Sequence, residues 1–159
     1  MFNRGENVFA DYDSVWKGYT KHEGKNGGWY DLHKNISTDW IKDKHPNKPI
    51  VDFLVENGYK IKVLLGIQNV KEKYHIKWSN PDILINGFLA DIKTVETSIV
   101  SRLKSAKSQH VSYVVLKIPD NLTIDDIEAG FKEFREDYHT DMEILYIYKN
   151  QIFRRTIKI

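Results

Sequence analysis

The chain has 159 residues, of which 41% are hydrophobic and 29% are charged, and its formal net charge is +2. This length and composition are typical of one globular domain and exclude a disordered tail. No apolar run approaches the ~18 residues of a membrane span, so we expect no membrane partner. The absence of cysteine excludes disulfides, thiolate metal sites and cysteine nucleophiles. Any chemistry must therefore come from carboxylates, lysines, histidines or hydroxyls.

The first third of the chain differs in composition from the rest. Residues 1–48 are polar and Gly-rich, and we predict an appendage that packs on a core formed by residues 49–159. Within the appendage, apolar residues recur at helical spacing over Val8–Tyr19 and predict an amphipathic helix. We expect a loop over Lys21–Gly28 and a short helix between Ser37 and His45. Tryptophans here could stack on bases, but core packing is the preferred interpretation.

From Pro49 onward, helix and strand patterns follow one another closely. The predicted elements are a helix around Ile50–Leu54 ending before Gly58, strands over Tyr59–Leu65 and Tyr74–Trp78, a hairpin around Asn86-Gly87, a helix from Thr97 or Ser98 to His110, a buried strand over Val111–Ile118, a helix from Thr123 to Tyr138, and a terminal hairpin of Glu143–Tyr148 and Gln151–Ile157. This order predicts a mixed α/β (α+β) fold, with helices flanking a mixed central sheet.

The hairpin around Asn86-Gly87 is the most informative segment. If these two residues form a tight turn, Asp82 lies directly opposite Asp91 on the neighbouring strand. Lys93 follows Asp91 by two positions and therefore projects from the same face. The other face collects apolar residues only, namely Ile83, Ile85, Phe88, Ala90 and Ile92. The register thus predicts two acids and a lysine together above an apolar underside.

Two carboxylates directly opposite each other on a sheet destabilise it unless something neutralises them. Mg²⁺ or Mn²⁺ suits carboxylate oxygens, and such an ion can activate water and stabilise charge on a phosphoryl group. Lys93 could then position or deprotonate the attacking water, or stabilise the developing phosphate charge. The alternative is a polar hairpin in which Asp82 belongs to a turn and Asp91 forms a surface pair with Lys93.

The order Pro-Asp, eight residues, Asp-X-Lys resembles the signature of the PD-(D/E)XK nuclease superfamily, over roughly residues 49–118. The resemblance implies a restriction-endonuclease-like core. The segments GYKIKVLL and PDILINGFLADIKTV, with a lysine-rich helix before Gln109, are similar to the C-terminal tRNA-nuclease toxin domain of contact-dependent growth inhibition (CdiA) proteins. The third-strand acid here is Asp rather than the commoner Glu, which shortens its reach to a metal.

This resemblance implies the functional residues. It makes Asp82, Asp91 and Lys93 catalytic, adds an acid from the preceding helix, and adds a supporting glutamine. Glu56 is the better candidate for that acid, with Asp52 one turn earlier on the same helix face, and Gln109 is the glutamine. Asp82, Asp91 and Glu56 would hold Mg²⁺ or Mn²⁺. On the following helix, Arg102, Lys104 and Lys107 are expected to form a basic face that follows a nucleic-acid backbone.

The sequence thus predicts a metal-dependent endonuclease, with RNA, specifically tRNA, favoured over DNA by the resemblance alone. The resemblance also implies a cognate immunity protein and a cytoplasmic site of action, reached by secretion or delivery into a target cell. Three alternatives stay open. They are a DNA nuclease of a phage or mobile element, a non-catalytic nucleic-acid-binding module of the same fold, and a metal-independent ribonuclease that uses the dispersed histidines.

Overall fold

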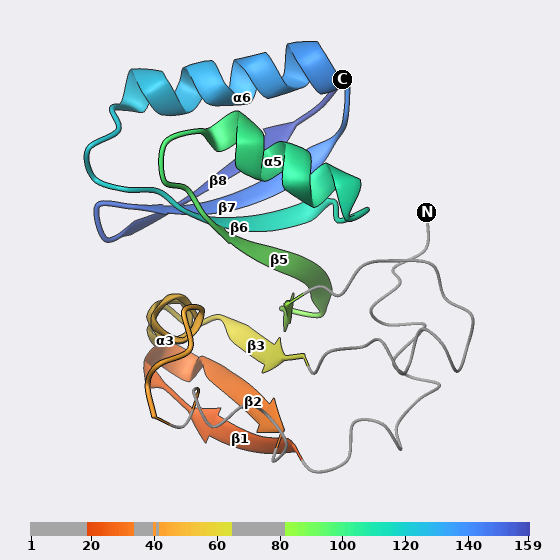
Figure 1. The fold of residues 1–159 in the computed structure, drawn as a ribbon. Helices are drawn as coiled ribbons and strands as arrows, with labels where there is room; N and C mark the ends of the chain where they lie inside the picture. Colours follow the sequence, from red (N-terminus) through yellow and green to blue (C-terminus); the bar gives the residue numbers. More distant parts are fainter. Residues whose placement is uncertain (1–18, 34–39, 41, 65–81) are drawn as a thin grey trace. The chain divides into compact units, whose positions relative to one another are not determined.

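The structure, a computed structural model, describes residues 19–33, 40, 42–64 and 82–159 (Figure 1). The chain forms two compact units, residues 1–89 and 90–159. The described residues form α-helices together with parallel and antiparallel strand pairs, so the predicted mixed α/β class is confirmed. No helix among these residues is both long and apolar enough to cross a membrane.

The described residues of the first unit form a mixed arrangement of strands together with helix α3. Strands β1 (Tyr19–Glu23) and β2 (Trp29–His33) pair antiparallel, and β2 pairs parallel with β3 (Lys60–Val63). Strand β4 (Ile83–Ile85) pairs antiparallel with β3. Helix α3 (Lys48–Glu56) precedes β3, as predicted. The strands of the N-terminal segment therefore share hydrogen bonds with strands from beyond residue 49, while the predicted division at residue 48 stays a prediction.

The β1–β2 hairpin was not predicted. The expected loop over Lys21–Gly28 is wrong for Lys21–Glu23, which belong to β1, and Tyr19 opens that strand rather than closing a helix. The remainder of that predicted helix lies outside the described residues. The register pairs polar residues, such as Lys21 with Asp31, so these strands lack the apolar alternation by which strands are recognised. Strand β2 pairs in addition with β3, over Trp29–Asp31.

The turn between β1 and β2 fits against the end of α3. It contains a short 3-10 helix, Lys25–Gly27, and the Asn26 side-chain amide donates to the Glu56 carbonyl at 2.9 Å. A Cβ atom on Gly28 would lie 2.0 Å from the Val55 carbonyl oxygen. Because no side chain fits at that distance, a glycine is required at this contact.

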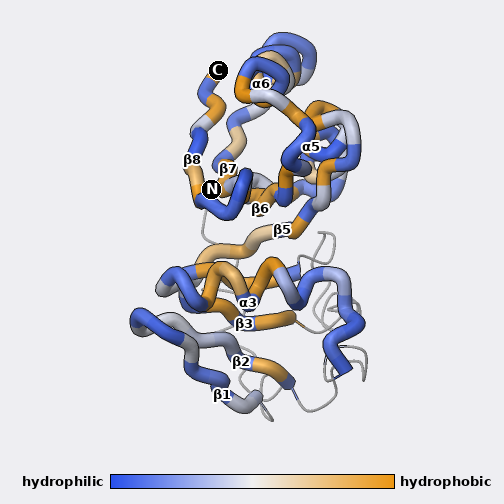
Figure 2. Tube along the Cα trace, turned by 90° about the vertical axis from the view of Figure 1, so that its left-hand side faces the viewer, coloured by the Kyte–Doolittle hydropathy of each residue, from blue (hydrophilic) through white to orange (hydrophobic). Residues whose placement is uncertain are grey.

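The two faces of the first sheet differ in character. In β3 and β4, Ile61, Val63, Ile83 and Ile85 are buried, whereas the alternating residues Lys60, Lys62 and Leu84 are exposed or half-buried. Helix α3 buries its own apolar residues, Ile50, Val51, Leu54 and Val55, and contacts β2 and β3. Figure 2 shows these hydrophobic segments of α3 and β3 next to each other. The opposite face of the sheet is polar.

The second unit is a sheet with two helices on one face (Figure 1). Its elements are β5 (Phe88–Thr94, from Ala90 onward in this unit), α5 (Ile99–Ser108), β6 (Tyr113–Lys117), α6 (Ile124–Tyr138), β7 (Met142–Tyr148) and β8 (Gln151–Ile157). Strands β5, β6 and β7 pair parallel in that order, and β8 pairs antiparallel with β7. Apolar residues of α5, α6, β6 and β7 form one buried cluster, which includes Leu103, Phe131 and Leu116.

The helix caps and hairpin turns from Asn86 onward form as the sequence predicts. The Ser98 hydroxyl accepts from the Ser101 N–H at the start of α5, and Thr123 forms a capping box with Asp126 at the start of α6. Asn86-Gly87 and Lys149-Asn150 have positive φ at both positions, as two-residue hairpin turns require. The predicted strand over Tyr74–Trp78 lies outside the described residues, as do residues 37–39 and 41 of the predicted helix between Ser37 and His45. Trp40 is helical, whereas residues 42–45 form a turn and irregular backbone, so the helix prediction is wrong for that part.

The capping box of α6 yields a stability prediction. Thr123→Ala removes the hydroxyl that accepts from the Asp126 N–H at 3.1 Å, so we expect the free energy of unfolding to fall by about 1 kcal/mol. Urea unfolding followed by circular dichroism measures this change. Thr97→Ala, an exposed threonine before α5, is the matched control. Equal stability of the two variants would contradict the capping role.

The same box predicts a pH dependence. The backbone N–H and the side chain of Thr123 hold the pKa of the Asp126 carboxyl below its ordinary value. Since the folded pKa is depressed, this stabilisation is present above the unfolded pKa of about 4 and is lost as the pH falls through the folded pKa. The stability difference between wild type and Asp126→Asn should therefore shrink between pH 7 and pH 3. The prediction would be contradicted if the stability difference stayed constant with pH. It would also be contradicted if Asp125→Asn showed the same pH dependence as Asp126→Asn.

Candidate functional site

Asp91 lies in the middle of β5 and is 3% exposed. Among the described residues it is the one buried carboxylate, and His33 is the only other buried polar or charged residue. Carboxylates are almost never buried to this extent without a partner, because desolvation penalises their charged form. The alternative interpretation of Asp91 as half of a surface pair is therefore wrong.

Lys93 supplies that partner. Its Nζ lies 2.8 Å from Asp91 Oδ2, and its side chain is 13% exposed. The contact follows from strand geometry, since residues two apart project from the same face. In the parallel register Asp91 pairs with Val114 and Lys93 with Leu116. Val114 and Leu116 belong to the cluster packed with α5 and α6, so the ion pair lies on the helix-covered face of the sheet.

Gln109 completes the cluster from α5. Lys93 Nζ donates to Gln109 Oε1 at 3.0 Å. Gln109 is the C-terminal cap of α5, and its N–H donates to the Ser105 and Ala106 carbonyl oxygens. The helix end thus fixes the backbone that carries the amide. The structure brings together the three predicted residues Asp91, Lys93 and Gln109 across a strand and a helix.

One oxygen of this cluster has an unused acceptor position. Asp91 Oδ2 is buried and lies within ion-pair distance of Lys93, yet it accepts no hydrogen bond. A buried acceptor left in this state costs free energy. Hard oxygen donors of this kind bind Mg²⁺ or Mn²⁺, so the chemistry of Asp91 is compatible with such an ion.

The two other predicted acids belong to the first unit. Glu56 ends α3 with an exposed side chain, and its carbonyl is held by Asn26. Asp82 directly precedes β4, is half-buried, and its carbonyl accepts from the Leu64 N–H at 3.0 Å. The Asp52 carboxylate pairs with Lys48 at 2.8 Å. Within the described parts of the chain, no group of three His, Asp or Glu residues is arranged around a metal position. The predicted pairing of Asp82 with Asp91 stays a prediction.

Most of the residues predicted to form the apolar underside of the hairpin are buried. Ile83, Ile85, Ala90 and Ile92 are buried, whereas Phe88 is 51% exposed. Phe88 is the first residue after the Asn86-Gly87 turn, so it lies at the turn end of the hairpin.

The three basic residues of α5 do not form one face. Arg102 and Lys104 are two residues apart, which places them about 200° apart around the helix axis. Lys104 and Lys107 share a flank and are exposed. Arg102 instead precedes Gln109 by seven residues, two turns or about 10 Å along the same helix face. Sequence reasoning missed this alignment, although the spacing of seven could have revealed it.

Comparison with known proteins finds one family and one solved structure. Residues 79–152 match the model of the contact-dependent growth inhibition CdiA C-terminal domain. That segment contains Asp82, Asp91, Lys93 and Gln109, whereas Glu56 lies before it. A search of curated proteins found no match.

The structural match is to a chain of the CdiA-CT/CdiI toxin and immunity complex from Burkholderia pseudomallei. The TM-score is 0.52 at 16% sequence identity, and the match covers 79% of this chain and 92% of that chain. At this identity the likeness shows a common fold.

The buried ion pair yields a prediction that does not depend on activity. Lys93→Met leaves the Asp91 charge buried and unpaired, so the free energy of unfolding should fall by about 3–5 kcal/mol. Asp91→Asn/Lys93→Met removes both charges and should recover part of that loss. Urea unfolding of the single and double variants measures the coupling, with the exposed Lys104→Met as control. A double variant no more stable than Lys93→Met would contradict the pairing.

Proposed function

We propose that the chain is a toxin domain that cleaves nucleic acid by metal-dependent phosphodiester hydrolysis. The family match over residues 79–152 supports the toxin assignment, because that family is described as the CdiA C-terminal domain. The PD-(D/E)XK assignment rests on the order of Asp82, Asp91 and Lys93 in the sequence. One observation supports the proposal that the chain is an enzyme. The buried acid Asp91 contacts Lys93, and Lys93 in turn donates a hydrogen bond to Gln109.

A polar cluster of this kind is costly for stability alone. An apolar substitution at a buried ion pair is often neutral or stabilising, so the pair is weak support for a structural role. Departures from an apolar core pattern concentrate at functional sites. Asp91 and Lys93 interrupt a strand that otherwise buries Ala90 and Ile92. We therefore assign the cluster to catalysis.

Asp91 is the ligand through which a divalent ion would be held, and Asp82 and Glu56 are further ligands proposed from the sequence alone. A bound Mg²⁺ or Mn²⁺ would supply Lewis-acid stabilisation of the scissile phosphate and an acidified water. The protein's own contribution is to hold the Asp91 carboxylate rigidly within a strand. Its burial keeps competing water away from the oxygen that accepts no hydrogen bond.

Lys93 is the cationic group of the proposed mechanism. An ammonium held by Asp91 on one side and Gln109 on the other keeps a fixed position and needs no reorganisation during the reaction. In that position it stabilises the negative charge that develops on the phosphoryl oxygens as water attacks. Gln109 acts as a positioning residue, because its amide oxygen orients the Lys93 Nζ.

The proposed substrate is RNA, with tRNA first, on the basis of the sequence resemblance. Arg102 lies two turns along α5 from Gln109 on the same face, so its guanidinium is the proposed contact to a phosphate next to the scissile one. Lys104 and Lys107, on the other flank, would add sequence-independent attraction.

A cognate immunity protein is the proposed partner, and delivery into a target cell is the proposed route to the substrate. The solved relative is a complex of a toxin with its immunity protein, which supports this partner by analogy of fold. A gene that protects cells against this chain would be expected beside its own.

Cleavage assays test the proposed function. Wild type, Asp91→Asn and Lys93→Met are incubated with total tRNA, plasmid DNA and single-stranded DNA, in Mg²⁺ or in EDTA. We expect tRNA to be cut only in Mg²⁺, and each variant to lose at least about 100-fold in rate. Asp137→Asn and Lys132→Met, exposed residues of α6, are the matched controls. Circular dichroism confirms folding.

The other outcomes separate the alternatives. Cutting of DNA alone would replace RNA by DNA as substrate. Activity that survives EDTA would contradict the metal mechanism and favour the histidine-based one. If folded wild type cuts none of these substrates, the assignment as an enzyme is contradicted. The non-catalytic binding module then becomes the preferred interpretation.

A further inference from the structure

The polar face of the first sheet gathers lysines and aromatic rings. The register places Lys21, Trp29 and Lys62 on one face of β1, β2 and β3, opposite the face that carries Ile61 and Val63. Lys21 Nζ lies 4.4 Å from the centroid of the Trp29 ring. Lys62 Nζ lies 4.9 Å from the centroid of the Tyr19 ring. Cations and aromatic faces therefore alternate across the sheet.

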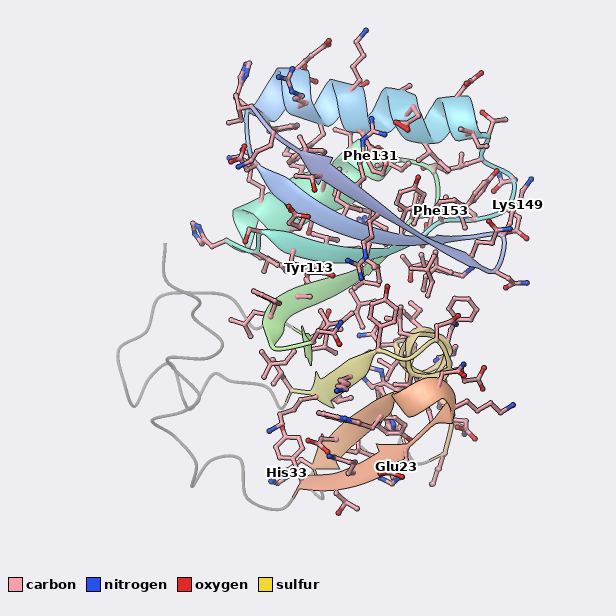
Figure 3. The ribbon with its side chains drawn as sticks, turned by 180° about the vertical axis from the view of Figure 1, so that it is seen from behind. Glu23, His33, Tyr113, Phe131, Lys149 and Phe153 are labelled. Atoms are coloured by element: carbon pink, nitrogen blue, oxygen red, sulfur yellow. The ribbon has the colours of Figure 1, made fainter. Side chains whose placement is uncertain are left out.

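Part of this face is hollowed into a pocket of about 500 Å³. Its lining residues are Trp29, Gly58, Lys60, Lys62, Leu84, Asn86 and Gly87, and none of them is acidic. Acidic residues occur on the same face outside the pocket: Asp31 opposite Lys62, Glu23 opposite Trp29, and Asp82 two residues before Leu84. Glu23 and His33 mark the two ends of the β1–β2 hairpin in Figure 3. The pocket thus combines one large ring, two ammonium groups and an exposed amide.

We propose that this face binds a single-stranded nucleic acid, with one base stacked on Trp29 in the pocket and flanking phosphates paired with Lys60 and Lys62. Aromatic side chains on a sheet, interleaved with cations, are the general means of holding unstacked bases. A base has the size and the flat π-face that the half-buried Trp29 accommodates. A duplex keeps its bases stacked inside and cannot use this pocket. The inference rests on the proposed function, in which the bound strand is the substrate.

The position of Asp82 connects this face to the proposed chemistry. Asp82 precedes Leu84 by two residues, and the Leu64 N–H donates to the Asp82 carbonyl, so the strand pairing continues to Asp82. By alternation Asp82 lies on the same face as Leu84, which lines the pocket. A strand held on Trp29 and Lys62 would therefore run over the face that carries Asp82.

Binding is measured separately from cleavage. The full chain is titrated in EDTA against a fluorescein-labelled 12-nucleotide RNA, the same DNA, and the duplex, and anisotropy gives the affinity. Trp29→Leu and Lys60→Ala/Lys62→Ala are each expected to weaken single-strand binding about 10-fold or more. The lysine variant should also lower the salt dependence, since each lost phosphate contact removes about 0.7 from the slope of log K against log salt. The control variant is Lys42→Ala/Lys44→Ala. It replaces two exposed lysines of the same unit and so carries the same charge change.

The outcomes are distinct. Wild-type affinity in both Trp29→Leu and the Lys60/Lys62 variant would overturn the inference, as would equal loss in the Lys42/Lys44 control or tighter binding of the duplex. RNA and DNA arms identify which single strand is preferred. Single-strand binding that depends on Trp29 in a wild type that cuts nothing would retain the inference and remove the proposed nuclease. Cutting by a chain whose single-strand binding does not depend on Trp29 would retain the proposed nuclease and remove the inference.

Discussion

The ion pair between Asp91 and Lys93 is the interaction around which the candidate site is built. It places two opposite charges on the helix-covered face of a sheet, next to Val114 and Leu116. The fold tolerates it because the two groups neutralise each other and Gln109 accepts a further hydrogen bond from the ammonium. One carboxylate oxygen still accepts none. That oxygen, Oδ2, contacts the Lys93 ammonium at 2.8 Å, and as a hard oxygen donor it is compatible with a divalent ion.

The second unit gives this pair a rigid setting. Asp91 and Lys93 are held by parallel pairing with β6, and Gln109 is held by the end of α5. Helices α5 and α6 both start at side-chain caps, at Ser98 and Thr123. A preorganised cluster of this kind is what electrostatic stabilisation of a transition state requires, because fixed dipoles and charges need not move during the reaction.

Much of the fold from Pro49 onward could be predicted from the sequence, because its signals are local. Asn86-Gly87 and Lys149-Asn150 specify turns, and Ser98 and Thr123 specify helix starts. The β1–β2 hairpin could not be predicted, because its polar residues pair mainly with each other and carry no apolar period. The meeting of Asp91 with Lys93 followed from strand alternation. The failure of Arg102 and Lys104 to share a face follows from helix geometry, which the charge pattern alone does not convey.

We propose that the buried Asp91 carboxylate is kept as a ligand for a divalent metal ion. Isothermal titration calorimetry of Mn²⁺ into folded wild type and folded Asp91→Asn tests it directly, without reference to any substrate. We expect a saturable site in wild type whose Mn²⁺ affinity falls at least about 10-fold in Asp91→Asn and is unchanged in Asp137→Asn. Equal Mn²⁺ affinity in wild type and Asp91→Asn would contradict it.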